Sequence, residues 1–335
     1  MKTLVTGAGG FIGSHLSEAL LKDAEGAGGG RGTEVWGIDA PVNPHLWWLK
    51  ERNLAGLNQH PMFHFVKEDI RCTDWEDLLE GVKTVFHLAA IPGVRTSWGS
   101  GFRDYVDNNI IATQHLLEAC KNHSRRGQST LLVFASSSSV YGEKPGRVEE
   151  GLPLTPLSPY GITKLTCEHL CQVYNRRYGI PVIILRYFTV YGPRQRPDMA
   201  FHRFIKAMLR ERPITVYGDG HQTRDFTYVS DCVEATAACI NAQGAVGRAI
   251  NIGGRERASV LDVIALLEKS LQREARLEFS AERGDEPKHT WADTSRAEEL
   301  LGYRPKVSLQ EGLSKELDYL RGLDRDVVNN KVNGS

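Results

Sequence analysis

The stretch TLVTGAGGFIG, residues 3–13, runs from a short apolar segment through a glycine-rich turn into a helical pattern. Gly7, Gly10 and Gly13 are spaced GxxGxxG in this turn. Without side chains at these positions, the backbone can approach a pyrophosphate at the N-terminus of the helix. A tight structural turn could use the same glycines, but the order of strand, glycines and helix favours a dinucleotide site.

Apolar runs alternate with helical patterns along the first half of the chain. After FIGSHLSEALLKD come EVWGID, HFVKED, TVFHLAA, TLLVFASS and VIILRY. Continuous apolar strands separated by helices indicate a parallel sheet that is covered on both faces. We therefore predict an α/β fold: a Rossmann-type, doubly wound parallel sheet with a smaller C-terminal α/β substrate domain.

A chain of 335 residues is long enough for two domains. We assign residues 1–187, together with 225–254, to the dinucleotide-binding domain, because SDCVEATAACINA and RAINIGG look like a helix and a strand that return to the core. The irregular segments 188–224 and 255–322 are assigned to the second, substrate-binding domain. Residues 323–335 are expected to form a flexible tail.

The composition excludes several classes of protein. The 41 basic residues balance the 41 acidic ones, which argues against a nucleic-acid partner. We expect no membrane association and a cytoplasmic location, because the sequence has neither a signal peptide at its beginning nor a run of about 18 apolar residues. Six scattered cysteines without a CxxC pair suggest neither a disulfide framework nor a metal site.

The second apolar run ends in Asp39. A carboxylate there accepts hydrogen bonds from both ribose hydroxyls of NAD and repels the 2′-phosphate of NADP, so NAD is the predicted cofactor. The alternative is an aspartate that only caps a turn. Further positions at strand ends are expected to line the adenine or the floor of the cofactor site, although the last three could simply pack in the core: Asp69, Ile70, Leu88, Ala89 and Ala90.

The segment SPYGITK places Tyr160 and Lys164 one helical turn apart. A neighbouring ammonium lowers the pKa of a phenol, so Tyr160 is the predicted general base, and Lys164 is also expected to hold the nicotinamide ribose. An isolated YxxxK pair is often only an exposed helix face. Here LLVFASSSSVYG leads an apolar strand into four serines, and we expect Ser137 to orient the reacting oxygen beside Tyr160.

The successive motifs TGAGGFIG, Asp39, HLAA, SSSSVYG, YGITK and RYFTVYGP resemble those of extended short-chain dehydrogenases that act on sugar nucleotides. GVR, RPDMAF and RDFTYVSD are most similar to the UDP-glucuronate 4-epimerase branch. The resemblance implies that Tyr160 takes the proton of the sugar's 4-hydroxyl while hydride passes from carbon 4 to NAD. The 4-keto sugar would then rotate within the site and be reduced on its opposite face.

The resemblance also implies contacts for the remaining ligand groups. Arg224 and Arg283 are candidates for the diphosphate, and Asp285 for the uridine ribose. Each arginine could instead be a solvated loop residue. Four further residues are expected at the cofactor: Phe11, Ile12, Asn109 and Tyr187. Others are expected near the uracil, the diphosphate or a substrate carboxylate: Val216, Tyr217, Arg95, Arg196 and Arg203.

Ser138 and Ser139 decide which reaction follows the first oxidation. Related dehydratases have an acidic pair at these positions, and related decarboxylases have a glutamate at the second. The absence of acidic side chains here favours 4-epimerisation. Neutral hydroxyls can also donate hydrogen bonds to a substrate carboxylate. Thr189 fits the same branch, because the glucose-type epimerases more often have asparagine there.

The predicted activity is therefore the conversion of UDP-glucuronate to UDP-galacturonate. The alternatives are a UDP-glucose or UDP-N-acetylhexosamine 4-epimerase, a UDP-glucuronate decarboxylase or NDP-sugar dehydratase that finds its acid elsewhere, and an NAD-binding regulatory module. The regulatory module has no need of Ser137, Tyr160 and Lys164. The family resemblance implies a homodimer through the Tyr160 helix and the helix near residues 103–121.

Overall fold

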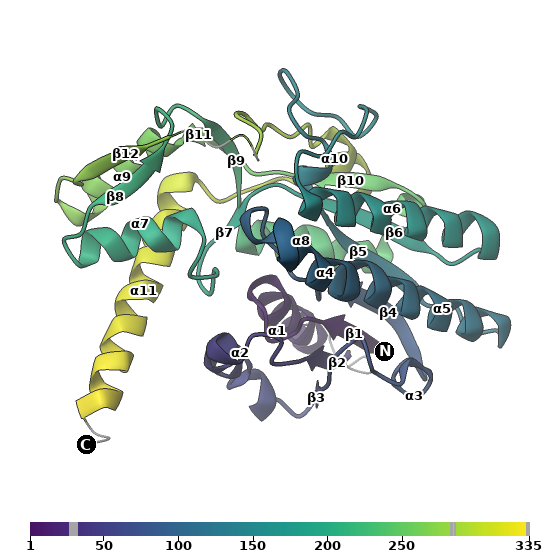
Figure 1. Ribbon diagram of the computed structural model, residues 1–335. Helices are drawn as coiled ribbons and strands as arrows, with labels where there is room; N and C mark the ends of the chain where they lie inside the picture. The colour runs from purple at the N-terminus through teal and green to yellow at the C-terminus, as the bar shows by residue number, and fades with distance from the viewer. Residues whose placement is uncertain (27–32, 282–283, 285, 333–335) are drawn as a thin grey trace.

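A computed structural model describes residues 1–26, 33–281, 284 and 286–332. Its main element is a seven-stranded sheet with the strand order β10-β6-β5-β4-β1-β2-β3 (Figure 1). All six pairs of neighbouring strands are parallel. The strands are β1 (Lys2–Thr6), β2 (Glu34–Asp39), β3 (Phe63–Lys67), β4 (Val82–His87), β5 (Leu131–Ser137), β6 (Val182–Tyr187) and β10 (Ala249–Ile252).

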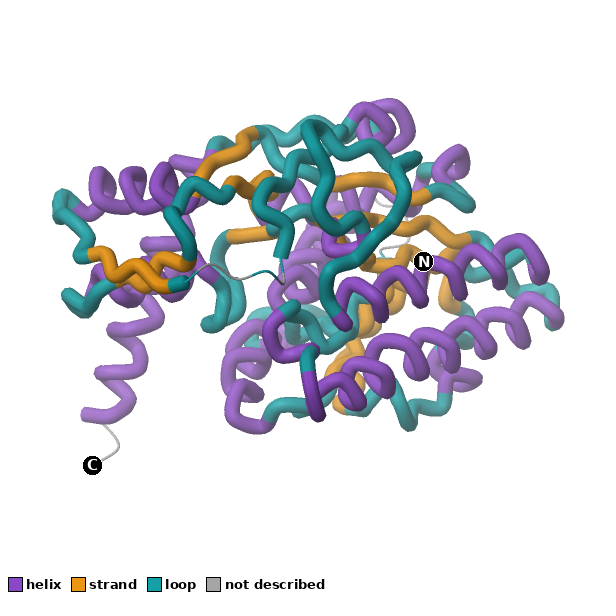
Figure 2. Tube along the Cα trace, turned by 45° about the horizontal axis from the view of Figure 1, so that its top comes forward, coloured by secondary structure: helices purple, strands orange, loops and turns teal. Residues whose placement is uncertain are grey.

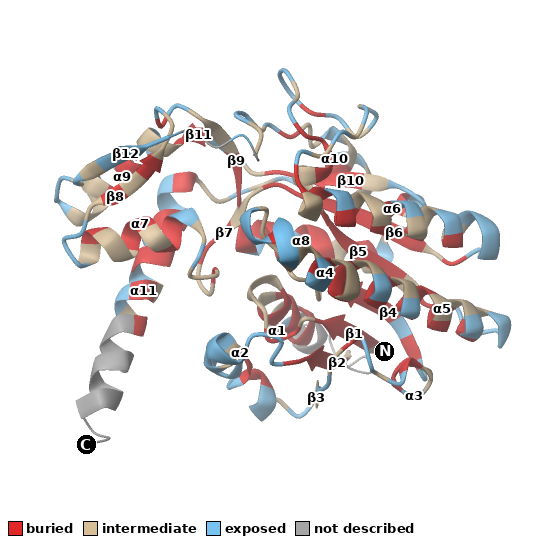
Figure 3. Ribbon diagram, viewed as in Figure 1, coloured by how far each residue is buried: buried red, intermediate tan, exposed pale blue. Residues whose placement is uncertain are grey.

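Helices cover both faces of this sheet. Val5 on β1 belongs to one hydrophobic cluster and its neighbour Leu4 to another, because alternate residues of a strand point to opposite faces. The Val5 face packs against α1 (Phe11–Gly26) and α8 (Val229–Ala238), and the Leu4 face against α5 (Ala112–Arg125) and α6 (Pro159–Tyr178). Buried residues accordingly follow the strands in Figure 3. The predicted doubly wound parallel sheet is confirmed.

Two small sheets lie beside the large one. The first contains β7 (Val190–Tyr191), β9 (Thr223–Tyr228) and β11 (Glu256–Ser259), and the second pairs β8 (Ile214–Tyr217) with β12 (Leu277–Ser280). Figure 2 shows loops gathered between these strands and the large sheet. The remaining helices are α2 (Trp47–Leu54), α3 (Trp75–Leu78), α4 (Phe102–Tyr105), α7 (Ala200–Leu209), α9 (Val260–Leu271), α10 (Ser295–Leu301) and α11 (Leu309–Val332).

The C-terminal segment forms a long helix. Residues 323–332, which we predict as a flexible tail, continue helix α11 to Val332. The helix is stabilised at its start by an ion pair between Lys315 and Glu311, one turn apart. Its buried leucines recur at helical spacing and pack into the larger hydrophobic cluster: Leu309, Leu313, Leu317, Leu320 and Leu323. Residues 333–335 lie outside the described part of the chain.

Helix α11 also contributes a buried carboxyl group to the turn that follows β7. Glu316 is 1% exposed, and its Oε2 accepts a hydrogen bond of 3.1 Å from the backbone N–H of Gly192. Within the described residues, its Oε1 has no hydrogen-bond partner. Burial raises the pKa of Glu316 to about 8, so the side chain is neutral in the folded protein at neutral pH.

Two further observations concern membrane spans and metal ligands. Every helix in the described part of the chain is too short or too polar to traverse a lipid bilayer. Among the same residues, no three histidine, cysteine, aspartate or glutamate side chains come together as potential metal ligands.

We predict that Glu316→Gln stabilises the protein at alkaline pH. The wild-type carboxyl binds its proton more tightly when folded, so its contribution is complete below the ordinary pKa of 4.5 and is lost as the pH rises through about 8. Glutamine cannot ionise, so the variant should gain roughly 2–4 kcal/mol over wild type between pH 5 and pH 9. Urea unfolding of both proteins across this pH range measures the difference, and a constant difference would contradict the prediction.

Candidate active site

The glycine-rich turn leaves no room for side chains. Gly7 has a φ of +74°, and a Cβ atom on it would lie 3.0 Å from the backbone nitrogen of Ala89. A Cβ atom on Gly13 would lie 2.1 Å from the carbonyl oxygen of Gly7, and one on Gly10 would lie 3.0 Å from the same oxygen. The first turn of α1 therefore packs directly on the backbone of the turn, which is the geometry that a dinucleotide pyrophosphate requires.

Asp39 lies at the end of β2, beside this turn. It is buried, and its Oδ2 accepts a hydrogen bond of 3.0 Å from the backbone N–H of Gly9. Its Oδ1 accepts from the ammonium of Lys50 at 2.6 Å and from the backbone N–H of Ala40 at 2.8 Å. The predicted ribose-binding carboxylate and the glycine turn therefore form one site. Lys50 was missed by the sequence analysis, because it comes from α2, eleven residues further along the chain.

The next two strands bring further predicted residues to the same edge. Asp69 forms an ion pair of 2.6 Å with Arg71, which holds the pKa of this carboxyl below its usual value. Ile70 is buried beside it. At the end of β4, the hydroxyl oxygen of Thr6 accepts hydrogen bonds from the backbone N–H groups of Leu88 and Ala89. With Ala90, these half-buried residues continue the edge next to Gly7.

Two predicted cofactor residues are engaged with the protein itself. The amide of Asn109 donates to the oxygens of Ile91 and Thr163, both at 3.1 Å, and accepts from the backbone N–H of Ile91 at 2.8 Å. Tyr187 is buried, and its hydroxyl is 2.8 Å from that of Thr236 on α8. Their side chains therefore position neighbouring segments. Phe11 and Ile12 are half-buried in the first turn of α1.

Helix α6 begins with a sequence suited to its N-terminus. Ser158 caps the helix by accepting a hydrogen bond of 3.1 Å from the backbone N–H of Gly161, and Pro159 follows at the first helical position. Tyr160 therefore lies in the first turn, where its backbone N–H donates to the hydroxyl of Ser97 at 3.1 Å. Ser97 was not a predicted site residue, since an isolated serine carries no motif.

Strand β5 ends at the serines that face this helix. Ser137 accepts a hydrogen bond of 3.1 Å from the backbone N–H of Ser139 and so caps the short 3-10 helix Ser138–Val140. Its hydroxyl donates to Oγ of Ser139 at 3.1 Å, and it is near enough to Tyr160 to lower the pKa of that phenol. The structure thus brings together the hydroxyls of Ser137 and Tyr160, which the sequence analysis had paired from separate motifs.

The prediction that Lys164 lowers the pKa of Tyr160 is wrong for this structure. The ammonium of Lys164 donates a hydrogen bond of 2.8 Å to the carbonyl oxygen of Ala135, and burial lowers its own pKa. Burial raises the pKa of Tyr160, against the opposing effects of the neighbouring Ser137 hydroxyl and the charge of Arg196. The groups that favour the phenolate are therefore a hydroxyl and a guanidinium.

The charge of Arg196 acts on the phenol of Tyr160. Its Nη2 would lie 3.5 Å from a Cβ atom on Gly93, so the guanidinium reaches the loop that packs beside Tyr160. Its Nε and Nη2 donate to both carboxylate oxygens of Asp198, at 2.9 Å and 2.7 Å. This pairing holds the pKa of Asp198 below its usual value, so Asp198 is an anion and not a general acid near neutral pH.

Three residues predicted for the nucleotide part of the substrate converge from different elements. The guanidinium of Arg95 lies 5.0 Å from the ring centre of Tyr217. Arg95 and Arg224 both approach Glu286, at 3.9 Å and 3.1 Å respectively. Glu286 was missed by the sequence analysis, because its partners are distant in the chain. The clustered guanidinium groups suit the oxygens of a diphosphate.

The other predicted substrate residues are less closely associated with this cluster. Val216 is 1% exposed and belongs to the larger hydrophobic cluster, so its side chain packs in the core. Thr189 is half-buried between β6 and β7, and Arg203 is half-buried on α7. Arg283 and Asp285 lie outside the residues that the structure describes.

Comparisons with known proteins agree with this geometry. Residues 3–253 match the model of the NAD dependent epimerase/dehydratase family. An uncharacterized UDP-glucose epimerase of Bacillus subtilis is 54% identical over 96% of this chain and 99% of its own, and a UDP-glucuronate 4-epimerase of Thermodesulfobacterium geofontis is 38% identical over 94% and 95%. The crystal structure of UDP-glucuronic acid 4-epimerase from Bacillus cereus, in complex with UDP-glucuronic acid and NAD, is 52% identical. It superposes with a TM-score of 0.90 over 96% of this chain and 100% of that one.

We predict that Gly13→Ala weakens NAD binding by at least about tenfold and costs about 1–3 kcal/mol of stability. The added methyl would lie 2.1 Å from the carbonyl oxygen of Gly7, so the turn and helix α1 must separate. Isothermal titration with NAD and urea unfolding measure the two effects. The control is Gly56→Ala, where a Cβ atom meets nothing within 4 Å. Equal affinities of the two variants for NAD would refute the assignment of this turn.

Proposed function

This chain belongs to the NAD dependent epimerase/dehydratase family, and we propose that it is an NAD-dependent 4-epimerase that interconverts UDP-glucuronate and UDP-galacturonate. The nearness of Tyr160 to Ser137 carries the proposal, because a proton-transfer group beside a hydroxyl at the carboxyl edge of the parallel sheet suits oxidation of a sugar hydroxyl. The relatives above act on UDP-sugars by name, and the solved structure of one of them holds NAD.

The residues of the glycine turn and Asp39 would hold NAD, which supplies a hydride acceptor and donor when bound. Tyr160 would remove and return the proton of the sugar's 4-hydroxyl, with Ser137 orienting the same oxygen. Arg196 and the neighbouring Ser137 hydroxyl favour the phenolate that this role requires. Lys164 would keep its predicted place beside the nicotinamide ribose. We assign Arg95 and Arg224 to the diphosphate, where they would exchange Glu286 for phosphate oxygens.

The substrate carboxylate would be bound by Ser138, Ser139, Thr189 and Arg196. A 4-keto uronate is a β-keto acid that loses carbon dioxide readily, so the site must hold the carboxylate in an orientation that prevents cleavage. Hydroxyls and a guanidinium can do this without supplying a proton. A decarboxylase or dehydratase would need an acid at this point, and Asp198, the carboxylate beside Arg196, is held as an anion.

A product analysis tests the proposal against its alternatives. Purified protein is incubated with UDP-glucuronate, and the products are separated by anion exchange and identified by NMR. The proposal predicts UDP-galacturonate without UDP-pentose. A UDP-pentose product would identify a decarboxylase, and conversion of UDP-glucose but not of UDP-glucuronate would identify the glucose-type epimerase. Failure to change any of these sugars would favour a regulatory NAD-binding protein.

We predict that Ser138→Ala combined with Ser139→Ala discriminates between charged and neutral substrates. Each lost hydrogen bond to a carboxylate is worth about 1.5–3 kcal/mol, so kcat/KM for UDP-glucuronate should fall by at least about tenfold. Any activity on UDP-glucose should change far less, because that sugar has no carboxylate. Steady-state rates with both substrates measure the effect. Equal losses for both substrates would remove the role of these serines in carboxylate binding.

We further propose that two copies of the chain pair through α5 and α6 in the cytoplasm. Ile162 and Val173 on α6 are 45% and 48% exposed, and they lie three helical turns apart on one face. Ile111, just before α5, is 41% exposed on the same side of the sheet. Figure 3 shows exposed segments along the outer surface of these helices. Apolar side chains at this spacing suit packing against a second pair of helices.

Val173→Arg should therefore shift the protein from dimer to monomer. A charged side chain at a helix packing surface costs on the order of 2 kcal/mol or more per interface, so the dimer should dissociate at micromolar concentration. Analytical ultracentrifugation measures the mass. Trp48→Arg on α2 is the matched control, because Trp48 is 46% exposed but lies away from α5 and α6. A wild-type protein that is monomeric at all concentrations would overturn this arrangement.

A further inference from the structure

A buried ion pair joins helix α6 to strand β6, close to the serines at the end of β5. Glu168 on α6 and Arg186 on β6 have side chains that are 1% and 3% exposed. The Nη2 atom of Arg186 donates to Oε2 of Glu168 at 2.7 Å, and its Nε donates to Oε1 at 2.9 Å. The pair is therefore bidentate, which fixes the orientation of both side chains and not only their separation.

Glu168 also holds the end of strand β5. Its Oε1 accepts a hydrogen bond of 2.5 Å from the hydroxyl of Ser136. Ser136 is the register partner of Arg186 on the adjacent strand, so their side chains point to the same face of the sheet, toward α6. Ser136 directly precedes Ser137, and successive side chains of a strand point to opposite faces of the sheet. A shift of Ser136 would therefore move Ser137 as well.

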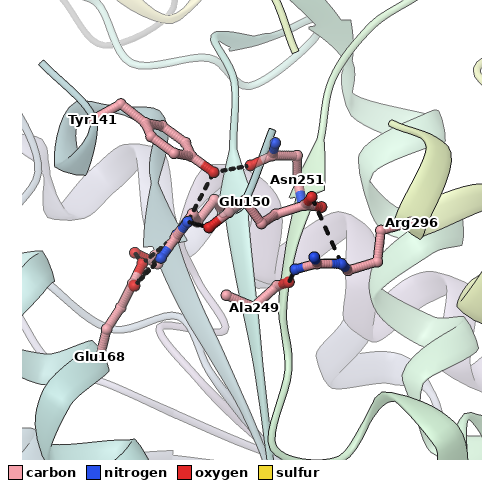
Figure 4. A network of polar contacts seen from close by, with 8 residues as sticks. Tyr141, Glu150, Glu168, Ala249, Asn251 and Arg296 are labelled. Carbon is pink, nitrogen blue, oxygen red and sulfur yellow. Dashed lines mark hydrogen bonds and ion pairs between the residues drawn. The ribbon is translucent and has the colours of Figure 1, made fainter. Parts of the chain in front are cut away.

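Arg186 holds Tyr141, the residue that follows the segment Ser137–Val140. Its Nη1 donates a hydrogen bond of 2.8 Å to the hydroxyl of Tyr141, which donates in turn to Oδ1 of Asn251 at 2.7 Å. Burial raises the pKa of Tyr141 to about 12, so its hydroxyl keeps the proton that it donates. Figure 4 shows Tyr141, Glu168 and Asn251 meeting in this network, with Glu150 in its middle and Arg296 beyond Glu150.

The ion pair thus anchors Ser136 and Tyr141, the residues on either side of Ser137–Val140. It is also fixed to the catalytic helix, because Glu168 lies one turn after Lys164 and two turns after Tyr160. The first turn of that helix is in close contact with the serines, since a Cβ atom on Gly161 would lie 2.6 Å from the carbonyl oxygen of Ser139.

Buried ion pairs add little net stability, because the cost of removing two charges from water offsets their attraction. The specific effect of this pair is therefore geometric. We propose that Glu168 and Arg186 are positioning residues that hold Ser137 beside Tyr160. The consequence for catalysis rests on the 4-epimerase activity proposed above.

The experiment replaces both charges together, with Glu168→Leu and Arg186→Met in one protein, so that no unpaired charge is left buried. We expect the thermal midpoint to remain near that of wild type. The value of kcat for UDP-glucuronate should fall by at least about 100-fold, while KM changes less than about threefold, because a small misplacement of reacting groups lowers the rate more than the binding.

A second measurement follows Tyr160 without any sugar. The phenolate absorbance of each protein is titrated against that of its Tyr160→Phe counterpart, which isolates this tyrosine. Because the neighbouring Ser137 hydroxyl lowers the pKa of Tyr160, Tyr160 in the double variant should titrate at higher pH than in wild type. If wild type fails to epimerise UDP-glucuronate, the proposed function fails, and the titration still decides the positioning role.

Two smaller changes serve if the double variant does not fold. Ser136→Ala and Tyr141→Phe each remove one hydroxyl that contacts the ion pair. Each should lower kcat by about fivefold to 20-fold and raise the pH at which Tyr160 titrates. Arg296→Gln is the matched control, because Arg296 contacts Glu150 and the carbonyl oxygen of Ala249 at the outer side of the network. Its kcat should stay within about twofold of wild type.

The outcomes separate a positioning role from a structural one. Loss of kcat together with the shifted titration in the double variant, or in both single variants, supports the proposal. Folded variants with wild-type kcat overturn it. Variants that lose kcat while Tyr160 titrates as in wild type also overturn it, because the ion pair would then act on something other than the placement of Ser137 beside Tyr160.

Discussion

The site depends on one juxtaposition, that of Ser137 at the end of β5 and Tyr160 in the first turn of α6, where the serine lowers the pKa of the phenol. These residues belong to a strand and a helix that a 21-residue connection separates, so only the folded sheet brings them together. The serine cap and the proline at the start of α6 fix where the helix begins, and therefore where the phenol lies. The adjacent glycine turn, at the same edge of the sheet, adds the dinucleotide site.

Electrostatics then determines what this juxtaposition can do. Burial opposes the phenolate of Tyr160, and the two opposing influences come from the Ser137 hydroxyl and the Arg196 guanidinium. The same guanidinium keeps the nearby Asp198 ionised. The proposed site therefore combines a base for the 4-hydroxyl with hydroxyl donors at Ser138 and Ser139, whereas the carboxylate beside Arg196 is unsuited to protonating an oxidised sugar. This combination favours return of the hydride over elimination or decarboxylation.

Local sequence was sufficient for the elements whose physics is local. The apolar runs predicted the parallel sheet. TGAGGFIG and Asp39 were predicted to form one site, and the backbone N–H of Gly9 donates to Oδ2 of Asp39 at 3.0 Å. Partners from distant segments carried no such signal: Lys50 for Asp39, Glu286 for Arg95 and Arg224, and Arg186 for Glu168. The expected effect of Lys164 on Tyr160 failed because spacing along a helix gives proximity, whereas burial and the hydrogen bond to Ala135 decide where the ammonium points.

The most direct test follows both bonds at risk in one substrate. UDP-glucuronate carrying deuterium at carbon 4 and carbon-13 in its carboxyl group is converted by the enzyme, and the product is examined by NMR and mass spectrometry. The account predicts UDP-galacturonate that retains both labels, because the hydride removed at carbon 4 returns to the same carbon while the carboxylate stays bound. Loss of the deuterium to solvent, or of the carbon-13 as carbon dioxide, would contradict it.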